Sequence, residues 1–536
     1  MSDPIDDTAN NSPLDCLLAW VKRRPDAAAV ARLNSICSYA HLLAGIQLAA
    51  TWLQGQGVRE NDRVATLFAP QPDETLRQIE LAYAIGWLGA TLLPLYPGTA
   101  RDQVVSVLSR FQTKFLLVSD ELATFPGHEI LPWPKDVIDV QIIAVSGYAT
   151  AAQFGNLNHP KSFLAPGVTP GAGVPMCPQQ PMRGFLYEFS SGTSGAPKVV
   201  LQSNGNYLLT AKVSGRAQGW KNTDVFMGAM RWPHKLGVRA VFRAHCMGAT
   251  LLDENFPLTR SRLTQLVGEA GLSSMTSTPV QLRMLLASPV PDEPALPLRL
   301  LSTSGAALAP GEVKNVRAQI TPNFYAVYGG TETGIVALLH PDDPEDAPMR
   351  VVPGVDLVAV DALGQTLPFG QSGRLRIRSS WVCDGYFNND SASAESFQGG
   401  WYVSNDLAEI SGDKLRLGSR ADDMVNFGGG KVDPFPVEEV LRQHPDVADA
   451  AVVAMADVWE GQVPVAFVVL RQTPDLDVLR QYVDTRLDAG QRPVFFVVSR
   501  ALPYNPDGKI KRNELRKIAD QLRSRVGLPS DMAPPV

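Results

Sequence analysis

Few features of this sequence would tie it to a metal cluster, a disulfide framework or nucleic acid. Its 536 residues include only five cysteines, which are scattered without a CxxC pair or the spacing of metal ligands. Lone cysteines of this kind are usually small core residues of proteins in a reducing cytoplasm. The net charge of −6 is spread without long runs of one sign, so nothing predicts a nucleic acid partner.

Targeting signals and long apolar runs are also missing. The start, MSDPIDDTANNSP, is acidic and polar, unlike a secretory signal peptide. The most apolar stretch, residues 79–98, carries Glu80 near one end and Pro94 near the other, and it lacks the uninterrupted span of about 20 residues that a membrane helix needs. It predicts a buried helix followed by a short strand. We therefore expect no transmembrane segment and a cytoplasmic location.

The length and periodicity of the chain predict an α/β protein with more than one domain. Between residues 14 and 290, strand-like apolar runs alternate with amphipathic stretches, which is typical of a mostly parallel sheet in a layered α/β domain. Residues 351–417 change to short alternating strands and predict a β-rich subdomain. We expect a disordered tail at residues 1–12, a large N-terminal domain at residues 13–421 and a small α+β C-terminal domain at residues 422–536.

The stretch YEFSSGTSGAPK follows a strand-like run and has the composition of a phosphate-binding loop. Glycines free the backbone amides to turn toward a ligand, while hydroxyls and a lysine add donors and positive charge. The residues concerned are Ser190, Ser191, Gly192, Thr193, Ser194, Gly195 and Lys198. The loop is not a Walker A motif, because no lysine directly follows the glycine. By itself, a loop of this composition is more often a solvated linker than a binding site.

Two other stretches also allow a functional and a neutral interpretation. YGGTETG, at Tyr328 to Gly334, holds an isolated carboxylate, Glu332, which suits Mg²⁺ beside phosphate oxygens or a hairpin turn with an exposed glutamate. NPDGKIKRNEL places Lys509 after a Pro-Asp-Gly turn. That lysine is a solvated charge unless the small domain carries it to a site elsewhere.

Together these stretches resemble the adenylate-forming superfamily of acyl- and aryl-CoA ligases, nonribosomal-peptide adenylation domains and beetle luciferases. FSSGTSGAPK resembles the phosphate loop, STSGAAL the adenine-side loop and YGGTE the aromatic–Gly–x–Thr–Glu motif. GGWYVSND resembles the ribose-aspartate motif, SRADDMVNFGGGKVDP the hinge segment and NPDGKIKR the motif of the catalytic lysine. The six motifs occur in order from about Leu14 to Leu515, and the resemblance implies a mobile C-terminal domain that carries the lysine.

The resemblance implies a nucleotide site with ATP and Mg²⁺. The loop from Ser190 to Lys198 would hold the β- and γ-phosphates, and Tyr328 would stack on adenine. The backbone lining that site would come from Gly305, Ala306, Ala307 and Gly329. Thr331 would contact the α-phosphate, and Glu332 would be the metal ligand.

The resemblance also implies a ribose site, a hinge and a catalytic group. Asp406 would accept hydrogen bonds from the ribose hydroxyls, with Arg420 beside it. Asp422 would be the hinge residue about which the small domain turns. Lys509 would bridge the substrate carboxylate and the α-phosphate during adenylation. Because these charged residues are all present, the sequence predicts an active enzyme.

The stretch RWPHKLGV bears on the acid substrate. His234 and Gly237 fit a His-x-x-Gly motif that gates the acid pocket of CoA ligases, and Gly330 would line the same site. His234 is equally explained as a histidine bonded to backbone. No aspartate lies between Arg231 and Val241, which favours an acid without an α-amino group. Lys235 and Arg239 could meet a polar acid or the CoA phosphates, but such residues are more often simply exposed.

The glycine run Gly428, Gly429 and Gly430 resembles the loop along which CoA ligases place the pantetheine arm. The sequence therefore predicts a carboxylic acid substrate and CoA as acceptor, in an AMP-forming acid–CoA ligase. We expect no carrier domain after the small domain, so the first alternative is a stand-alone adenylation enzyme that loads a separate acyl carrier protein or forms an amide. A nucleotide-binding protein without turnover is the second alternative.

Overall fold

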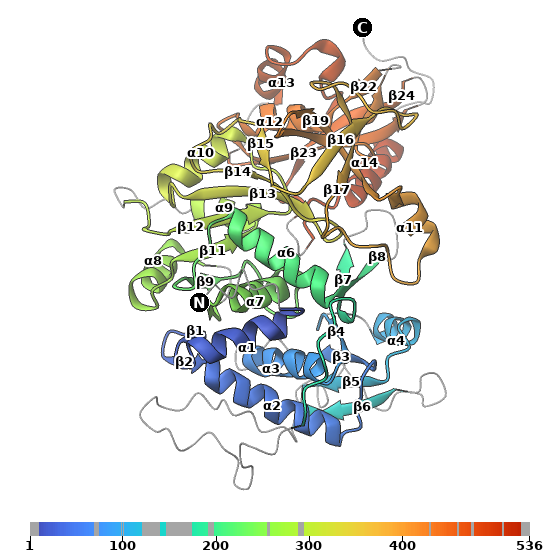
Figure 1. The fold of residues 1–536 in the computed structure, drawn as a ribbon. Coiled ribbons are helices and arrows are strands. Elements are labelled where there is room, and N and C mark those ends of the chain that lie inside the picture. Colours follow the sequence, from blue (N-terminus) through green and yellow to red (C-terminus); the bar gives the residue numbers. More distant parts are fainter. Residues whose placement is uncertain are drawn as a thin grey trace.

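Figure 1 shows the fold of the chain in a computed structural model. The structure describes residues 10–68, 74–97, 99, 101–119, 140–145, 174–190, 198–254, 258–287, 294–427, 430–457, 460–472, 476–505 and 509–526. Of the tail expected at residues 1–12, the first nine residues lie outside these ranges. Ser12 is fully buried, and its side chain caps the first helix, so the folded domain includes the end of that segment.

Within the described residues, one sheet near the N-terminus has six strands in the order β6-β5-β3-β4-β7-β8. All neighbours are parallel except the hairpin of β7 and β8. The strands are β3 (Arg63–Leu67), β4 (Thr91–Leu95), β5 (Phe115–Val118), β6 (Gln141–Ala144), β7 (Gly184–Ser190) and β8 (Lys198–Ser203). The helices before and between them are α2 (Tyr39–Gly55), α3 (Glu74–Trp87) and α4 (Arg101–Arg110). Helix α3 is almost wholly buried and leads into β4, which confirms the buried helix and strand expected there.

The second sheet runs β16-β17-β19-β20-β15-β14-β13-β12-β11-β9-β10-β1-β2, with β18 paired to β19. From β1 through β13 its neighbours are parallel except at the edge strand β2, and from β13 onward they are antiparallel. The parallel half holds β1 (Ala28–Arg32), β2 (Ser35–Ser38), β9 (Val225–Met227), β10 (Thr250–Leu252), β11 (Ser274–Ser277), β12 (Leu300–Ser304) and β13 (Phe324–Gly330). The antiparallel half holds β14 (Gly334–Leu339), β15 (Met349–Val351), β16 (Asp356–Val360), β17 (Ser372–Arg378), β18 (Phe397–Gln398), β19 (Trp401–Ser411) and β20 (Lys414–Arg420). This change of pairing is the β-rich subdomain that the sequence predicted.

The helices of the large domain pack into a core shared by both sheets. They include α1 (Pro13–Arg23), α6 (Asn204–Ala217), α7 (Lys235–Met247), α8 (Arg260–Glu269), α9 (Pro279–Leu286), α10 (Pro310–Gln319) and α11 (Asp390–Ser396). One buried cluster joins Val64 of the first sheet to Phe226 of the second through side chains of α2, α3 and α7. Inside it, the hydroxyl of Tyr83 lies 3.1 Å from Nδ1 of the buried His245. Burial lowers the pKa of His245 to about 4, so its imidazole is neutral at pH 7.

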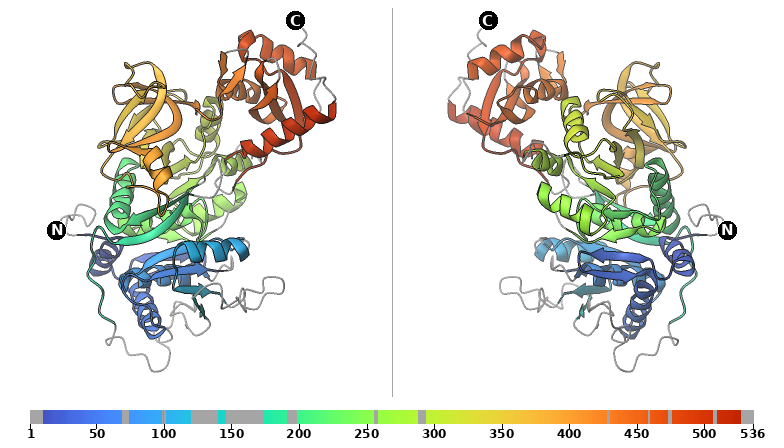
Figure 2. Two further views of the ribbon diagram at one scale, coloured as in Figure 1. Left: turned by 90° about the vertical axis from the view of Figure 1, so that its right-hand side faces the viewer. Right: turned by 90° about the vertical axis from the view of Figure 1, so that its left-hand side faces the viewer.

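The C-terminal domain forms a separate sheet, ordered β22-β21-β24-β23 with β25 beside β24. Its strands are β21 (Val425–Phe427), β22 (Gly430–Val432), β23 (Val447–Asp457), β24 (Gly461–Leu470) and β25 (Phe495–Ser499), and its helices are α12 (Pro434–Arg442), α13 (Leu476–Asp484) and α14 (Arg512–Val526). Figure 2 shows this domain at the end of the molecule opposite α2 and the six-stranded sheet. The two-part α/β fold class predicted from the sequence is confirmed, while the boundary at residue 421 stays a prediction.

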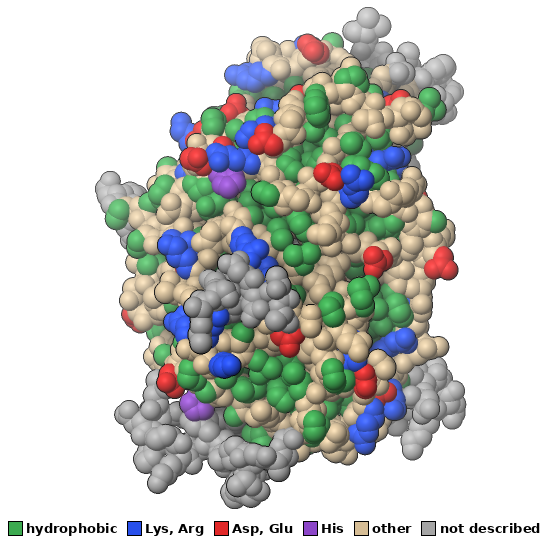
Figure 3. All heavy atoms as spheres, viewed as in Figure 1, with side chains coloured by type: hydrophobic (Ala, Val, Ile, Leu, Met, Phe, Trp, Pro, Cys, Tyr) green, Lys and Arg blue, Asp and Glu red, His purple; other side chains and the backbone are tan. Residues whose placement is uncertain are grey.

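The surface agrees with the even distribution of charge along the sequence. On the face drawn in Figure 3, Lys and Arg side chains alternate with Asp and Glu and do not gather into one patch. No helix within the described ranges is both long enough and apolar enough to cross a membrane.

Candidate active site

The predicted nucleotide residues meet at one edge of the large sheet. Strands β12 and β13 are parallel neighbours, with Ser304 opposite Val327, so both end at this edge. The loop after β12 carries Gly305, Ala306 and Ala307, all exposed, and Gly305 turns it with a φ of +102°. Tyr328 and Gly329 lie in the last three residues of β13, next to the end of β12 from which that loop starts. The carboxyl ends of parallel strands are where α/β proteins bind ligands.

Strands β13 and β14 form a tight hairpin around Thr331 and Glu332. A Cβ at Gly329 would lie only 2.0 Å from the carbonyl oxygen of Gly334, so this close approach of two backbones requires glycine. Glu332 is only 9% exposed. The hairpin alternative was therefore right about the turn and wrong about an exposed glutamate. A buried carboxylate at a sheet edge needs a counter-charge or a hydrogen bond.

Glu332 obtains that hydrogen bond from Tyr386, a residue that the sequence did not single out. The Tyr386 hydroxyl donates to Oε1 of Glu332 at 3.0 Å. Burial and the Glu332 charge raise the pKa of Tyr386, so it stays a neutral donor. Nζ of Lys198, the first residue of β8, lies 4.7 Å from the centre of the same ring. Lys198, at the end of the predicted phosphate loop, and Glu332, the predicted metal ligand, therefore both contact Tyr386.

Asp406 lies beside Tyr328, as the two predicted roles require. The Tyr328 hydroxyl donates to Oδ2 of Asp406 at 2.6 Å, and Oγ of Ser404 donates to the same oxygen at 2.7 Å. Ser404 was not predicted, although residues two apart on a strand share a face. Burial and the charge of Asp406 raise the pKa of Tyr328 well above its usual range. The predicted adenine and ribose contacts thus form one hydrogen-bonded unit.

Arg420 connects this unit to the predicted hinge. It lies opposite Asp406 in the pairing of β19 with β20, and its Nε donates to Oδ1 of Asp422 at 3.1 Å. Burial alone would lower the pKa of Arg420, but the carboxylates of Asp422 and Asp406 outweigh burial and raise it. The arginine is therefore charged and already paired on the hinge side.

A buried charge network lies under the Thr331 turn. Arg239 of α7 binds both carboxylate oxygens of Glu188 on β7, at 2.7 and 2.6 Å. The same guanidinium donates to the carbonyl oxygens of Gly330 and Thr331 at 3.2 and 3.3 Å. Nε2 of Gln202 donates to Glu188 and to the Thr331 carbonyl at 3.0 and 3.2 Å. The alternative of a simply exposed Arg239 was wrong, because this arginine holds the backbone of the hairpin.

His234 and Gly237 begin α7. Nδ1 of His234 accepts a hydrogen bond from the backbone of Leu236 at 3.2 Å, which caps the helix and matches the backbone-bonded alternative. A Cβ at Gly237 would lie 2.4 Å from the carbonyl oxygen of Arg231, so glycine lets the helix pack against residues 230–231. A gating role for the imidazole stays a prediction.

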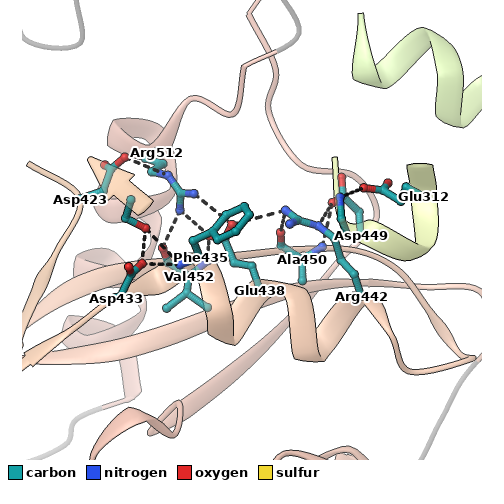
Figure 4. Close-up of polar contacts among 12 residues, drawn as sticks. Glu312, Asp423, Asp433, Phe435, Glu438, Arg442, Asp449, Ala450, Val452 and Arg512 are labelled. Atoms are coloured by element: carbon teal, nitrogen blue, oxygen red, sulfur yellow. Dashed lines mark hydrogen bonds and ion pairs between the residues drawn. The ribbon is translucent and has the colours of Figure 1, made fainter. Parts of the chain in front are cut away.

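Lys509 lies in the small domain, on the loop between β25 and α14. Its backbone N–H donates to Oδ1 of Asn505 at 2.8 Å, and the Asn505 N–H donates to its carbonyl oxygen at 2.8 Å. Arg512, three residues on, binds Oε1 of Glu438 at 2.6 Å, and its Nε lies 3.2 Å from Oδ2 of Asp423 (Figure 4). These ion pairs of Arg512 connect the loop that carries Lys509, hereafter the lysine loop, to α12 and to the segment after Asp422.

Some predicted residues lie outside the described ranges. They are Ser191, Gly192, Thr193, Ser194 and Gly195 of the phosphate loop, and Gly428 and Gly429 of the glycine run. Ser190 is the last residue of β7, and Gly430 is the first of β22. Among the described residues no group of three or more His, Cys, Asp or Glu side chains is placed to hold a metal ion. Glu332 would hold Mg²⁺ together with phosphate oxygens, which is how Mg²⁺ usually binds.

Comparison with known protein families decides the relationship. A family described as AMP-binding enzyme matches residues 17–387, and its C-terminal domain matches residues 436–509. The chain belongs to the AMP-binding enzymes. The resemblance to the adenylate-forming superfamily is thereby confirmed, and the alternative of a non-enzyme loses its support.

The curated relatives are acid-activating ligases. Human mitochondrial acyl-coenzyme A synthetase ACSM3 is 27% identical over 359 residues, which is 61% of this chain but only 59% of that protein. A 4-chlorobenzoate–CoA ligase of Arthrobacter is 28% identical, and the alignment covers 95% of this chain and 97% of that protein. A salicyl-AMP ligase/salicyl-S-ArCP synthetase of Mycobacterium tuberculosis is 27% identical, covering 96% and 91%. These names describe the relatives.

A solved structure supports the fold. The anthranilate CoA ligase AuaEII, in complex with anthranoyl-AMP, superposes with a TM-score of 0.81 at 22% identity. The superposition covers 98% of this chain and 100% of that protein. The chain therefore shares the fold of that protein along nearly its whole length.

Proposed function

We propose that this chain is an AMP-forming acid–CoA ligase. It converts a carboxylic acid and ATP to an acyl-adenylate and pyrophosphate, and it then transfers the acyl group to CoA. The observation that carries the proposal is the meeting of two groups at one sheet edge: Tyr328 with Asp406, and Glu332 with Tyr386 and Lys198. Relatives named as CoA ligases across the length of the chain support it.

The residues of this chain would divide the first step among them. Tyr328 and Asp406 would hold the adenosine, and Lys198 would neutralise the outer phosphates. A carboxylate oxygen of the acid attacks the α-phosphorus, and the bond to the pyrophosphate oxygen breaks. Two anions meet in this step, so Lys509 would lie between the carboxylate and the α-phosphate, where cationic groups stabilise developing charge. Mg²⁺ held by Glu332 would supply further charge neutralisation.

The second step needs an acceptor at the acyl carbonyl. A thiol that has lost its proton attacks the carbonyl carbon through sulfur, and the bond between that carbon and the phosphate oxygen breaks as AMP leaves. We take CoA as the thiol because relatives named as CoA ligases match nearly the full chain. A carrier-protein thiol is the second candidate, because one full-length relative is named as a salicyl-S-ArCP synthetase. A cytoplasmic location is part of this proposal, supported by five cysteines that are all free.

One assay tests both steps. Exchange of labelled pyrophosphate into ATP is measured with a panel of carboxylic acids, and thioester formation is then measured with and without CoA. Acid-dependent exchange followed by CoA thioester is the expected result. Exchange without any CoA thioester would move the acceptor to a carrier protein or an amine. Absence of exchange with every acid would contradict acid activation itself.

A further inference from the structure

An ion pair lies on the two helices that follow β11 and β12. These strands are parallel neighbours, with Ser277 opposite Thr303, so α9 and α10 both start at the sheet edge where the predicted nucleotide residues meet. Arg283 of α9 donates to both carboxylate oxygens of Glu312 on α10, at 2.6 and 3.3 Å. Both residues lie near the starts of their helices, and a helix rises only about 1.5 Å per residue, so the pair stays close to that edge.

The backbone holds Glu312 in place. Its Oε2 accepts a hydrogen bond from the N–H of Ala309, the residue before α10, at 2.8 Å. The carboxylate is therefore fixed to the start of its own helix and cannot follow the arginine elsewhere. Arg283 and Glu312 are both partly buried. The arginine is thus a positive group with a defined position beside the candidate site.

The small domain presents a negative group to this arginine. Figure 4 shows Glu312 next to Asp449 of β23, at the place where the two domains meet. The Tyr504 hydroxyl donates to Oδ2 of Asp449, and Nε of Arg442 lies 3.2 Å from its Oδ1. Two carboxylates that face each other from different domains repel unless a cation lies near both. Arg283 is that cation.

The ionisation of the two sides shows that they interact. Burial alone would lower the pKa of Arg283, but the Glu312 carboxylate and the Asp449 carboxylate across the boundary outweigh burial and raise it. Burial and Asp449 raise the pKa of Tyr504, whereas the charge of Arg283 opposes this rise. At pH 7 the arginine is therefore charged and the tyrosine is a neutral donor. Arg283 and Asp449 attract each other through their charges, without a direct hydrogen bond.

Tyr504 connects this contact to the catalytic lysine. It pairs with Ile510 in an isolated bridge, so it lies at the base of the lysine loop. Within that loop Asn505 and Lys509 exchange two hydrogen bonds of 2.8 Å. The position of Tyr504 therefore determines where the backbone of Lys509 lies.

A second connection runs through charged side chains, whose signs alternate from the large domain to the lysine loop. Arg442, which contacts Asp449, also lies 3.4 Å from Oε2 of Glu438, and Glu438 binds Arg512 after the lysine loop. In order, the series is Glu312, Arg283, Asp449, Arg442, Glu438 and Arg512. Most of it is visible in Figure 4. The contact at Arg283 is the step of this series that crosses from one domain to the other.

We propose that Arg283 is a positioning residue for adenylation, which attracts Asp449 and its bound Tyr504 to the edge of the large sheet and so places the lysine loop at the nucleotide site. Arg283 touches neither ATP nor the acid, and it acts through Lys509. Glu312 orients the guanidinium. This inference rests on the proposed acid activation and on the role proposed there for Lys509.

The test measures the two half-reactions separately. With an acid that supports exchange, Arg283→Met should lower kcat for pyrophosphate exchange about tenfold and change KM for ATP and acid by less than about twofold, because a displaced group slows chemistry without weakening binding. Thioester formation from supplied acyl-adenylate and CoA, which does not use Lys509 in the proposed mechanism, should stay near the wild-type rate. Equal losses in both half-reactions would mean that Arg283 has a structural role only, and unchanged exchange would also overturn the inference.

Further variants test whether the arginine acts through the small domain. Arg283→Lys keeps the charge and should recover most of the exchange rate. Asp449→Asn should also slow exchange, and combining it with Arg283→Met should cause little further loss, because both changes remove one interaction. Losses that multiply in the double variant would show that Arg283 does not act through Asp449. Arg262→Met, which removes an ion pair with Glu254 at α8, is the matched control and should exchange at the wild-type rate.

X-ray scattering of the full chain without substrates tests the contact apart from the activity. Loss of the attraction should free the small domain, so Arg283→Met should have a larger radius of gyration than the wild type, and Arg262→Met should not. If no acid supports exchange, this increase would show that the contact holds the domains although the proposed function had failed. Scattering that Arg283→Met leaves unchanged would overturn the inference.

Discussion

Glu332 and Lys509, the two charged residues predicted to lie nearest the reacting atoms, are held in different ways. Glu332 lies in a hairpin whose backbone is bound by Arg239, and its carboxylate accepts from Tyr386. Lys509 lies on a loop of another domain, fixed through Arg512 to Glu438 and Asp423 (Figure 4). Glu332 belongs to the large sheet, whereas Lys509 belongs to the C-terminal domain, which has a sheet of its own.

In the proposed mechanism, this difference matches the different roles of the two residues. Rigid groups that position ATP belong in the packed sheet, because preorganised dipoles and charges stabilise a transition state without rearrangement. Lys509, which the proposed mechanism uses in the adenylation step, lies instead on the separate C-terminal domain, and many enzymes complete a site by the motion of a domain or loop. The connection of Ser419 on β20 to Asp433, the cap of α12, shows where the two halves join.

Breaking the network under the hairpin should have the largest effect on stability. Arg239→Met would leave Glu188, only 2% exposed, without its cation. Loss of one partner from a buried ion pair costs about 3–5 kcal/mol in the free energy of unfolding. Urea denaturation followed by circular dichroism measures it.

The control for that change is Arg378→Met, which removes an exposed partner of Asp356. Exposed pairs contribute roughly 0–1 kcal/mol, so this variant should be close to wild type. The double variant Glu188→Gln with Arg239→Met should recover part of the loss, because no charge is then left buried. Equal effects of Arg239→Met and Arg378→Met would show that the network does not hold the hairpin.

Removing the lysine should affect chemistry without affecting the packed half. Lys509→Ala should slow pyrophosphate exchange by about 10²–10³-fold, the usual effect of removing one group that stabilises a transition-state anion. ATP binding should be retained, because Tyr328, Asp406 and Lys198 are untouched. Equilibrium binding of ATP beside the exchange assay separates the two.

Lys511→Ala is the matched control, since Lys511 is exposed and pairs with Glu514 at 3.0 Å in the same segment. It should exchange pyrophosphate at nearly the wild-type rate. If Lys509→Ala keeps full exchange activity, or if both variants lose it equally, the assigned role of Lys509 is wrong.

The stability of the large domain should depend on pH through His245. The pKa of this imidazole is about 4 in the folded protein and about 6.5 in an unfolded chain. Between these values the unfolded state binds more protons, so the free energy of unfolding falls as pH decreases from about 6.5 to 4. The difference of roughly 2.5 pKa units corresponds to about 3 kcal/mol at most.

Urea denaturation at several pH values measures that slope, and His245→Gln supplies the comparison. The variant loses the hydrogen bond with Tyr83 and will be less stable throughout, but its stability should vary less between pH 6.5 and 4. An unchanged slope would mean that His245 does not remain neutral in the fold.

The sequence predicted the fold better than the contacts that support the site. The buried helix and the short strand expected within residues 79–98 were correctly located as α3 and β4, because burial imposes a local pattern of apolar residues on the chain. The order of the motifs identified the family and led to Tyr328, Glu332 and Asp406. Local sequence patterns predict which helix, strand or motif a residue belongs to, and no structure is needed for that prediction.

The sequence did not predict the contacts that support the site, because the residues that make them are distant from one another in the sequence. Glu188 and Arg239 are 51 residues apart, and Tyr386 and Glu332 are 54 apart. No short sequence motif predicts such a pair, and a lone arginine on a helix is usually exposed. Ser404 alone had a local signal, two residues before Asp406 on one strand.

The smallest expected effect concerns the link between the lysine loop and the hinge. Asp423 accepts from Arg516 at 2.7 Å and lies 3.2 Å from Nε of Arg512, so Asp423→Asn would weaken two contacts at once. Arg512 would still bind both oxygens of Glu438, which is 2% exposed. The variant should therefore lose only about 1 kcal/mol, in the range of partly exposed ion pairs.

Hydrogen exchange of the backbone amides at residues 509–516 measures this loss locally, with Asp356→Asn, at an exposed ion pair of the large domain, as the control. Faster exchange at the start of α14 in Asp423→Asn alone is the expected result. If adenylation falls as far as in Lys509→Ala while these amides stay protected, Asp423 acts on the reaction directly. If instead protection is lost across the small domain, the link stabilises that whole domain, and the lysine loop has no separate support of its own.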